Sequence, residues 1–223
     1  MRFKVFVAAG AAIAVAFAGP AHAGSFDSVD KRASGSGPAG TWSAASSVGS
    51  DGAFSLDTSV VDDPAAAATT VVAGSPVARA GVQGQKQFNL PAGIYDVSVT
   101  ATGVDADATG TDAGAGYVGL TIVFYCTCRT IDGNGMVYVV QSGGPTKSVR
   151  NATVTKTSRI TVVDDFPVTL GADMEAASAG GNSRVLETEP PALRFHTGDA
   201  SARATGVLGD IVVTFVAPLP PVL

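Results

Sequence analysis

The chain has 223 residues, of which 14 are Lys or Arg and 19 are Asp or Glu, so its formal net charge is −5 at pH 7. No run of basic residues is longer than Lys31-Arg32, and this disfavours nucleic-acid binding, which needs a concentrated positive patch to displace phosphate counterions. The same excess of acidic residues disfavours attachment to anionic membranes. The length of the chain suits one domain with a full core.

The first 23 residues are predicted to be a secretory signal peptide. Arg2 and Lys4 form a short positive region, a long apolar run follows, and Ala21-His22-Ala23 supplies the small residues needed for cleavage before Gly24. The apolar run is too short for a membrane span, which needs about 20 apolar residues. We therefore expect no membrane insertion and a secreted protein, extracellular or at the cell surface, with the periplasm as an alternative.

Residues 24–51 are rich in Gly, Ser and Ala, with few large apolar side chains. This composition is typical of flexible segments, and we predict a flexible lead-in here. Residues 52–217 are predicted to form a β-sandwich domain, and residues 218–223 a Pro-rich tail.

Beyond residue 52 the dominant pattern is an alternation of apolar and polar residues, which marks half-buried strands. The best examples are residues 94–102, 117–128, 136–141, 159–163, 168–176, 193–197 and 210–217. Turns rich in Gly, Pro and Asn separate them, and no window after the leader has an uninterrupted helical period. About ten such strands predict an all-β fold, an antiparallel β-sandwich most simply of the jelly-roll type, with an Ig-like sandwich as the alternative.

Cys126 and Cys128 are the two cysteines of the chain. Alternate residues of a strand lie about 6.5–7 Å apart, at the edge of disulfide reach, so a local bond needs a bulge or turn at Thr127. Export through an oxidising compartment favours a disulfide, either local or to another chain. Free thiols or a metal site are the alternatives.

Asp105, Asp107 and Asp112 are the candidate metal ligands. Alternate carboxylates that precede a glycine are similar to the first half of a calcium loop. The position at which a bidentate Glu would complete such a loop is Gly116. We predict a solvated hairpin loop and no cofactor here, with a Ca²⁺ site at these three residues as the alternative.

Tyr125 and Tyr138 are the candidate ligand-binding residues. They become neighbours if residues 117–128 and 136–141 form a hairpin, and exposed aromatic rings are surfaces on which sugars stack. The alternative is that both tyrosines cover the edge of the core. Asp173 and Glu175 share the outer face of one strand, where two carboxylates could line a polysaccharide groove.

The sequence contains no recognisable catalytic constellation. His196 is the single histidine left once the leader is removed, and no G-x-S-x-G motif joins a strand to a helix. We predict a non-enzymatic exported protein that acts as a structural, assembly or adhesion subunit, with further copies of itself or cell-surface components as partners. The alternative is a carbohydrate-binding module that binds glycans and is stabilised by calcium, and a further alternative is an enzyme acting on extracellular polysaccharide.

Overall fold

The computed structural model describes residues 26–37, 40–63, 76–111, 113–125, 129–133, 135–163, 167–188 and 191–220. Within these ranges the chain is all-β, and we find no helix there that is long and apolar enough to cross a membrane. The predicted signal peptide lies outside the described residues.

The described residues form thirteen strands. In chain order they are β1 (Ser28–Ser36), β2 (Gly40–Val48), β3 (Ala53–Asp62), β4 (Val77–Asn89), β5 (Gly93–Gly110), β6 (Ala115–Tyr125), β7 (Arg129–Asp132), β8 (Val137–Ser142), β9 (Lys147–Val162), β10 (Pro167–Ala179), β11 (Gly181–Thr188), β12 (Pro191–Gly198) and β13 (Ala200–Ala217).

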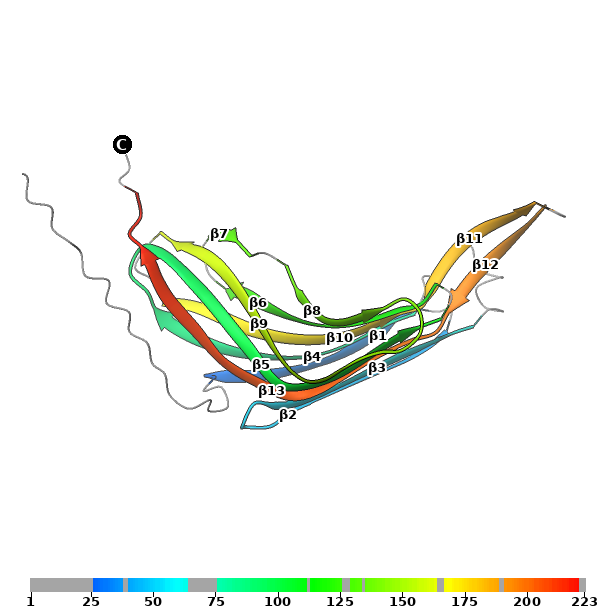
Figure 1. The fold of residues 1–223 in the computed structure, drawn as a ribbon, viewed down its shortest axis with the longest axis horizontal. Coiled ribbons are helices and arrows are strands. Elements are labelled where there is room, and N and C mark those ends of the chain that lie inside the picture. The colour runs from blue at the N-terminus through cyan, green and yellow to red at the C-terminus, as the bar shows by residue number, and fades with distance from the viewer. Residues whose placement is uncertain are drawn as a thin grey trace, which may run out of the picture.

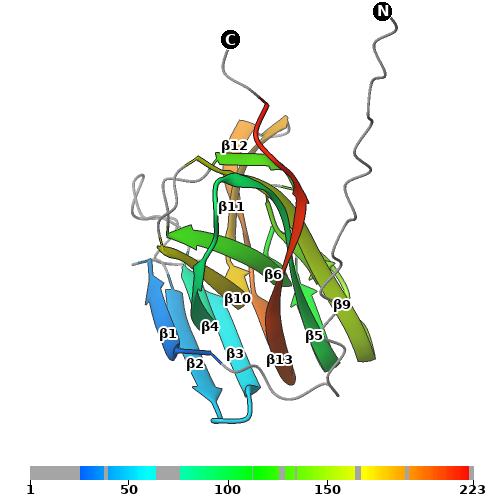
Figure 2. The ribbon, with the colours of Figure 1, turned by 90° about the vertical axis from the view of Figure 1, so that its left-hand side faces the viewer.

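Two antiparallel sheets pack face to face, as Figure 2 shows from one end. The five-stranded sheet has the order β1-β4-β10-β6-β8, and the six-stranded sheet has the order β2-β3-β13-β5-β9-β7. The hairpin of β11 and β12 is separate and projects from one end of the molecule (Figure 1). The predicted antiparallel β-sandwich is confirmed, and its strand order is consistent with the jelly-roll type.

The main apolar core lies between the two sheets, because alternate residues of the long strands point inward. Its largest fully buried side chains include Leu56, Leu120, Ile160, Leu170, Met174 and Leu208. At one end alanines replace these large residues, among them Ala108, Ala176 and Ala202. There a Cβ added to Gly116 of β6 would overlap the carbonyl of Ser201 in β13, so the two sheets approach closely and only small side chains fit between them.

The long strands β5, β9 and β13 bend in mid-course, which gives the molecule the curved outline seen in Figure 1. The register between β5 and β9 shifts between Ala101 and Val104, and that between β5 and β13 shifts between Thr205 and Val207. At this bend Asn151 has a φ angle of 48°. Asn is one of the residues that tolerate the left-handed conformation, so the bulge forms at low cost and turns the strands.

The prediction that residues 24–51 form a flexible lead-in is wrong, because β1 and β2 lie within this segment. β1 pairs with β4 in the five-stranded sheet, and β2 pairs with β3 in the six-stranded sheet. Their Ser-, Ala- and Gly-rich sequences have little alternation of their own. They are strands because the neighbouring strands offer hydrogen-bonding edges, so the sandwich begins at β1 rather than at residue 52.

Candidate functional site

The outer face of the five-stranded sheet carries a group of aromatic and polar side chains. We call this group the tyrosine face. It consists of Gln83 from β4, Tyr117 and Tyr125 from β6, Tyr138 from β8, and Asp173 and Glu175 from β10. Because side chains alternate along a strand, these residues point away from the core while neighbours such as Leu120 and Met174 are buried in it.

Tyr125 lies across β10 above Gly171. Its hydroxyl donates a hydrogen bond of 2.8 Å to Oε1 of Gln83 in β4, although the register places Tyr125 opposite Thr169. A Cβ added to Gly171 would lie 3.2 Å from Nε2 of Gln83 and 3.4 Å from the Tyr125 ring. Because Gly171 has no side chain, there is room for this diagonal contact. Tyr125 remains 49% exposed.

Gln83 is 4% exposed, and its side-chain nitrogen Nε2 has no hydrogen-bond partner among the described residues. Its oxygen Oε1 accepts hydrogen bonds from Tyr125 and, at 3.3 Å, from the side-chain amide of Gln85. A buried donor without a partner costs free energy, and such groups are uncommon in folded proteins. The tyrosine face therefore contains a buried hydrogen-bond donor that no described residue satisfies.

Asp173 is the most deeply buried carboxylate of the tyrosine face, with 8% of its side chain exposed. Nη2 of Arg32, in β1, donates to both of its oxygens at 2.6 and 2.7 Å. The guanidinium reaches Asp173 by lying over Gly81, where an added Cβ would be 3.2 Å from Nη2. Burial raises the pKa of Asp173 although the nearby Arg32 opposes this change.

Tyr117 contacts both Glu175 and the third tyrosine of the face, Tyr138. Tyr117 donates a hydrogen bond of 2.6 Å to Oε1 of Glu175, and Arg79 forms an ion pair of 3.5 Å with the same oxygen. The rings of Tyr117 and Tyr138 meet edge to face, with centroids 5.5 Å apart and planes at 89°. Burial, followed by the bond to Glu175, raises the pKa of the Tyr117 hydroxyl. This hydroxyl therefore stays protonated and continues to donate at any ordinary pH.

The predicted ligand residues Tyr125 and Tyr138 lie on this same face, and Tyr138 is 54% exposed. They are not the neighbours that a hairpin would make them. Tyr138 pairs with Gly119 and packs on Tyr117 instead. The reason is that β7, between them in sequence, pairs with β9 of the other sheet. The chain therefore leaves the five-stranded sheet before it returns as β8, and no simple hairpin turn sets the register.

Sequence reasoning did not identify Gln83 or Arg32. Gln83 belongs to a strand rich in Ala and Gly, and Arg32 to the segment expected to be flexible. The available signal was the row of glycines Gly81, Gly119 and Gly171 on outward positions of β4, β6 and β10, because outward glycines in strands often mark a place where another group lies close.

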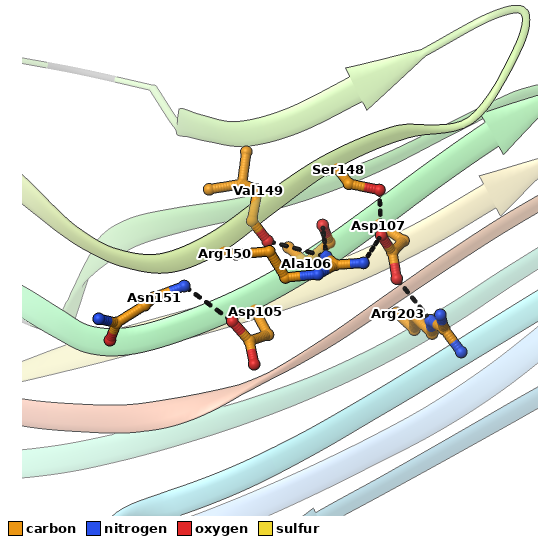
Figure 3. A network of polar contacts seen from close by, with 8 residues as sticks. All are labelled: Asp105, Ala106, Asp107, Ser148, Val149, Arg150, Asn151 and Arg203. Atoms are coloured by element: carbon orange, nitrogen blue, oxygen red, sulfur yellow. Dashed lines mark hydrogen bonds and ion pairs between the residues drawn. The ribbon is translucent and has the colours of Figure 1, made fainter.

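Two of the three predicted calcium ligands lie in a strand, because β5 continues to Gly110. The prediction of a solvated hairpin loop at Asp105 and Asp107 is therefore wrong. Figure 3 shows that Asp107 accepts hydrogen bonds from Ser148, from Arg150 at 2.6 Å and from Arg203 at 2.7 Å. The bond from Ser148, together with those from the two arginines, outweighs burial and lowers the pKa of Asp107 to about 2.

Asp105 accepts a hydrogen bond of 2.7 Å from the backbone nitrogen of Asn151 (Figure 3). Among the described residues, no group of three or more His, Cys, Asp or Glu side chains is placed to hold a metal ion. Asp112 lies outside the described residues, so the calcium site stays a prediction. A cation there would have to compete with Arg150 and Arg203 for Asp107.

Cys126 and Cys128 also lie outside the described residues, so the predicted disulfide and its alternatives remain open. His196 lies in β12, opposite Ser183 of β11. Asp173 and Glu175 share the outer face of β10, as predicted.

Comparisons with known proteins give no family. No protein-family model matches the chain, and no curated protein matches it. A solved structure described as TmCBM61 in complex with β-1,4-galactotriose is similar over 83% of this chain and 88% of that one, with 11% sequence identity and a TM-score of 0.17. At this level of similarity the match carries no argument about function.

Proposed function

We propose that the chain is an exported, non-catalytic glycan-binding protein that holds a neutral oligosaccharide against the tyrosine face. One observation carries the proposal: two half-exposed tyrosine rings stand beside buried polar side chains. Among these side chains is Gln83, whose amide nitrogen has no hydrogen-bond partner in the described part of the chain. Sugars present an apolar ring face and many hydroxyl groups. Aromatic rings with polar groups at their edges complement both features.

The charges of the tyrosine face favour a neutral ligand. Asp173 pairs with Arg32, and Glu175 pairs with Arg79, so the two carboxylates and the two guanidinium groups balance. A charged saccharide would disturb one of these pairs, whereas a neutral hydroxyl can donate to a carboxylate or accept from an arginine without doing so. The net negative charge of the chain also disfavours acidic polysaccharides.

The contacts of the two carboxylates support a binding role rather than hydrolysis. Glycoside hydrolysis needs one carboxyl group as a proton donor and a second as nucleophile or base, both directed at the scissile bond. Here Asp173 accepts two bonds from Arg32, and Glu175 accepts the Tyr117 hydroxyl. Each carboxylate is thus engaged within the protein, and we propose that neither acts as a catalyst.

Export is part of the proposal and rests on the leader at residues 1–23. Fractionation of the producing cells, followed by N-terminal sequencing of the exported protein, tests it. We expect the mature chain to begin at Gly24. A protein that stays inside the cell with residues 1–23 still attached would overturn this part of the proposal.

The test of glycan binding combines a screen with matched variants. An array of neutral galactose-, glucose- and mannose-based oligosaccharides identifies the ligand, and calorimetry then measures its affinity. Tyr125→Ala and Tyr138→Ala are each expected to weaken binding about tenfold, because an aromatic contact contributes about 1–2 kcal/mol. Phe215→Ala is the control, since this ring is equally exposed but belongs to β13 of the other sheet.

Two outcomes would contradict the proposal. The first is an array on which no neutral glycan binds. The second is a loss of affinity in Phe215→Ala as large as in the tyrosine variants, which would place the ligand elsewhere or indicate a general loss of folding. Circular dichroism of every variant separates these two causes.

An assembly or adhesion subunit is the second candidate function. The observation in its favour is the strand β2, a long edge strand without charges. Such an edge can accept a strand from another molecule. Solution mass measurement tests this candidate, and the glycan array tests the first one independently of it.

A further inference from the structure

The edges of the two sheets differ in how they are protected against pairing with other strands. Natural edge strands are commonly short, charged or interrupted by a bulge. β7 has four residues and a register shift, β8 has six residues and also a shift, and β1 carries Asp30, Lys31 and Arg32 at its centre. Among the described strands these three edges therefore have recognisable protection.

β2 has none of these protections. Its nine residues, Gly-Thr-Trp-Ser-Ala-Ala-Ser-Ser-Val, include no charge and no proline. Its pairing with β3 runs without a register shift from Gly40 to Val48. It ends the six-stranded sheet and lies along the lower rim of the molecule in Figure 1. Every second residue of such a strand directs its backbone N–H and C=O away from the sheet, so β2 presents a row of hydrogen-bonding groups.

Trp42 marks the same edge with exposed apolar surface. Its ring packs over Gly35 of β1, where an added Cβ would overlap it, and 44% of the residue remains exposed. Figure 2 shows β1 and β2 next to each other at this edge of the sandwich. An exposed tryptophan beside a row of backbone hydrogen-bonding groups is a typical composition for the centre of a protein interface.

We propose that β2 pairs in antiparallel orientation with β2 of a second copy of this chain, centred on Ala44. This places Trp42 opposite Ser46 of the second copy and Thr41 opposite its Ser47, and the reciprocal pairs form by symmetry. The two six-stranded sheets then become one continuous sheet. This inference goes beyond the proposed glycan binding and does not depend on it.

Charge and symmetry select a second copy as the occupant of this edge. The chain as a whole is acidic, so two copies repel each other over most of their surfaces. The uncharged β2 is a place where they can meet without opposing like charges. An antiparallel pair of identical strands is also related by a two-fold axis, the commonest symmetry of protein dimers.

The experiment measures the mass of the chain from Gly24 onward by sedimentation equilibrium over a range of concentrations. Reducing conditions exclude any bond through Cys126 or Cys128. We expect reversible dimers. The double variant Thr41→Lys, Ser47→Lys places lysines directly opposite each other twice in the dimer and is expected to raise the dimer dissociation constant about tenfold or more.

A charge exchange shows whether β2 itself forms the interface. The variant Thr41→Glu, Ser47→Glu is expected to be monomeric alone and to form a mixed dimer with the lysine variant. Formation of this mixed dimer also shows that both variants are folded. The control is Thr153→Lys, Thr157→Lys, which adds the same charge to exposed positions of the interior strand β9 and is expected to dimerise like the unaltered chain.

Three results would overturn the proposal. The first is an unaltered chain that stays monomeric up to its solubility limit. The second is a lysine variant that dimerises as well as the unaltered chain, because the interface would then lie elsewhere. The third is a failure of the lysine and glutamate variants to associate when mixed although each is folded by circular dichroism.

Discussion

The outer faces of the two sheets use polar side chains in different ways. On the six-stranded sheet, four pairs of polar partners stand directly opposite each other on neighbouring strands. These pairs are Asp96–Arg159, Thr100–Thr155, Asp107–Arg203 and Ser43–Ser59. On the tyrosine face, long side chains instead reach diagonally to a partner on another row, as Tyr125 does to Gln83 and Arg32 does to Asp173.

This difference separates a surface that stabilises a sheet from one that is shaped for a ligand. Directly opposite pairs follow from strand pairing alone and satisfy their groups locally. Diagonal contacts need empty positions beneath them, which Gly81 and Gly171 supply. They also bury Asp173 and leave the amide nitrogen of Gln83 without a partner among the described residues. Buried polar groups of this kind lower the stability of the fold, and proteins often keep such unfavourable features at their binding sites.

The largest expected effect comes from Arg32→Met. This change leaves Asp173 buried without its counter-charge and is expected to lower the free energy of unfolding by about 2 kcal/mol at neutral pH. The value is below that for a fully buried pair because half of the Arg32 side chain is in water. Denaturant titration measures it. Arg79→Met is the matched control, because its ion pair with Glu175 is longer and more exposed.

The effect of Arg32→Met is expected to depend on pH. The pKa of Asp173 is raised in the folded chain, so the folded state holds this proton more tightly than the unfolded state does. Stability then falls as the pH rises above the ordinary range of a carboxyl group, and removal of Arg32 steepens that fall. The loss in the variant should therefore shrink toward pH 4. An equal loss at both pH values would contradict this account.

Tyr117→Phe is expected to cost about 1 kcal/mol, because it removes a hydrogen bond to the charged Glu175 while the ring and its packing on Tyr138 remain. Tyr138→Phe serves as the comparison and is expected to change stability little. Thermal and denaturant unfolding of both variants provide the measurement. A larger loss of stability in Tyr138→Phe than in Tyr117→Phe would contradict this account, because the Tyr138 hydroxyl would then stabilise the fold more than that of Tyr117.

On the six-stranded sheet, Asp107→Asn is expected to cost at most about 1 kcal/mol, since both arginines that it contacts are largely exposed. The pKa of Asp107 is about 2, so its stabilising effect is complete above pH 4 and is lost as the pH falls from about 4 to 2. The variant should lack this part of the acid-induced decline. Parallel unfolding curves at pH 5 and pH 2.5 test the difference.

The smallest expected effect on stability is that of Gln83→Met. Methionine has a similar size and no unsatisfied donor, so the free energy of unfolding should stay within about 1 kcal/mol or rise. Glycan affinity should nevertheless fall, and calorimetry with the ligand found on the array measures this. A stable variant that binds glycan as well as the unaltered chain would remove Gln83 from the proposed site.

The sequence was informative where each strand has an apolar face of its own. The alternation in residues 94–102 and 168–176 predicted β5 and β10 and placed Asp173 with Glu175 on an outer face. It was uninformative for β1 and β2, whose small residues pair with β4 and β3 without a comparable apolar pattern. Strand formation there depends on the neighbours, which no local window contains.

The candidate site was predictable in part for the same reason. The tyrosines could be assigned to strands, but the position of Tyr138 beside Tyr117 depends on the crossing of β7 to the other sheet. The calcium prediction used local spacing alone. It could not include Arg203, which β13 brings to Asp107 from 96 positions away in the sequence.

Pairing through β2 would have a consequence for how strongly the protein holds a polymeric ligand. A two-fold axis through paired β2 strands stands perpendicular to the continuous sheet, so the five-stranded sheets of both copies lie on the same side of it. Both tyrosine faces would then be directed toward one surface. A polysaccharide or cell wall could engage both at once, and the resulting avidity would retain the protein even where each single site binds weakly.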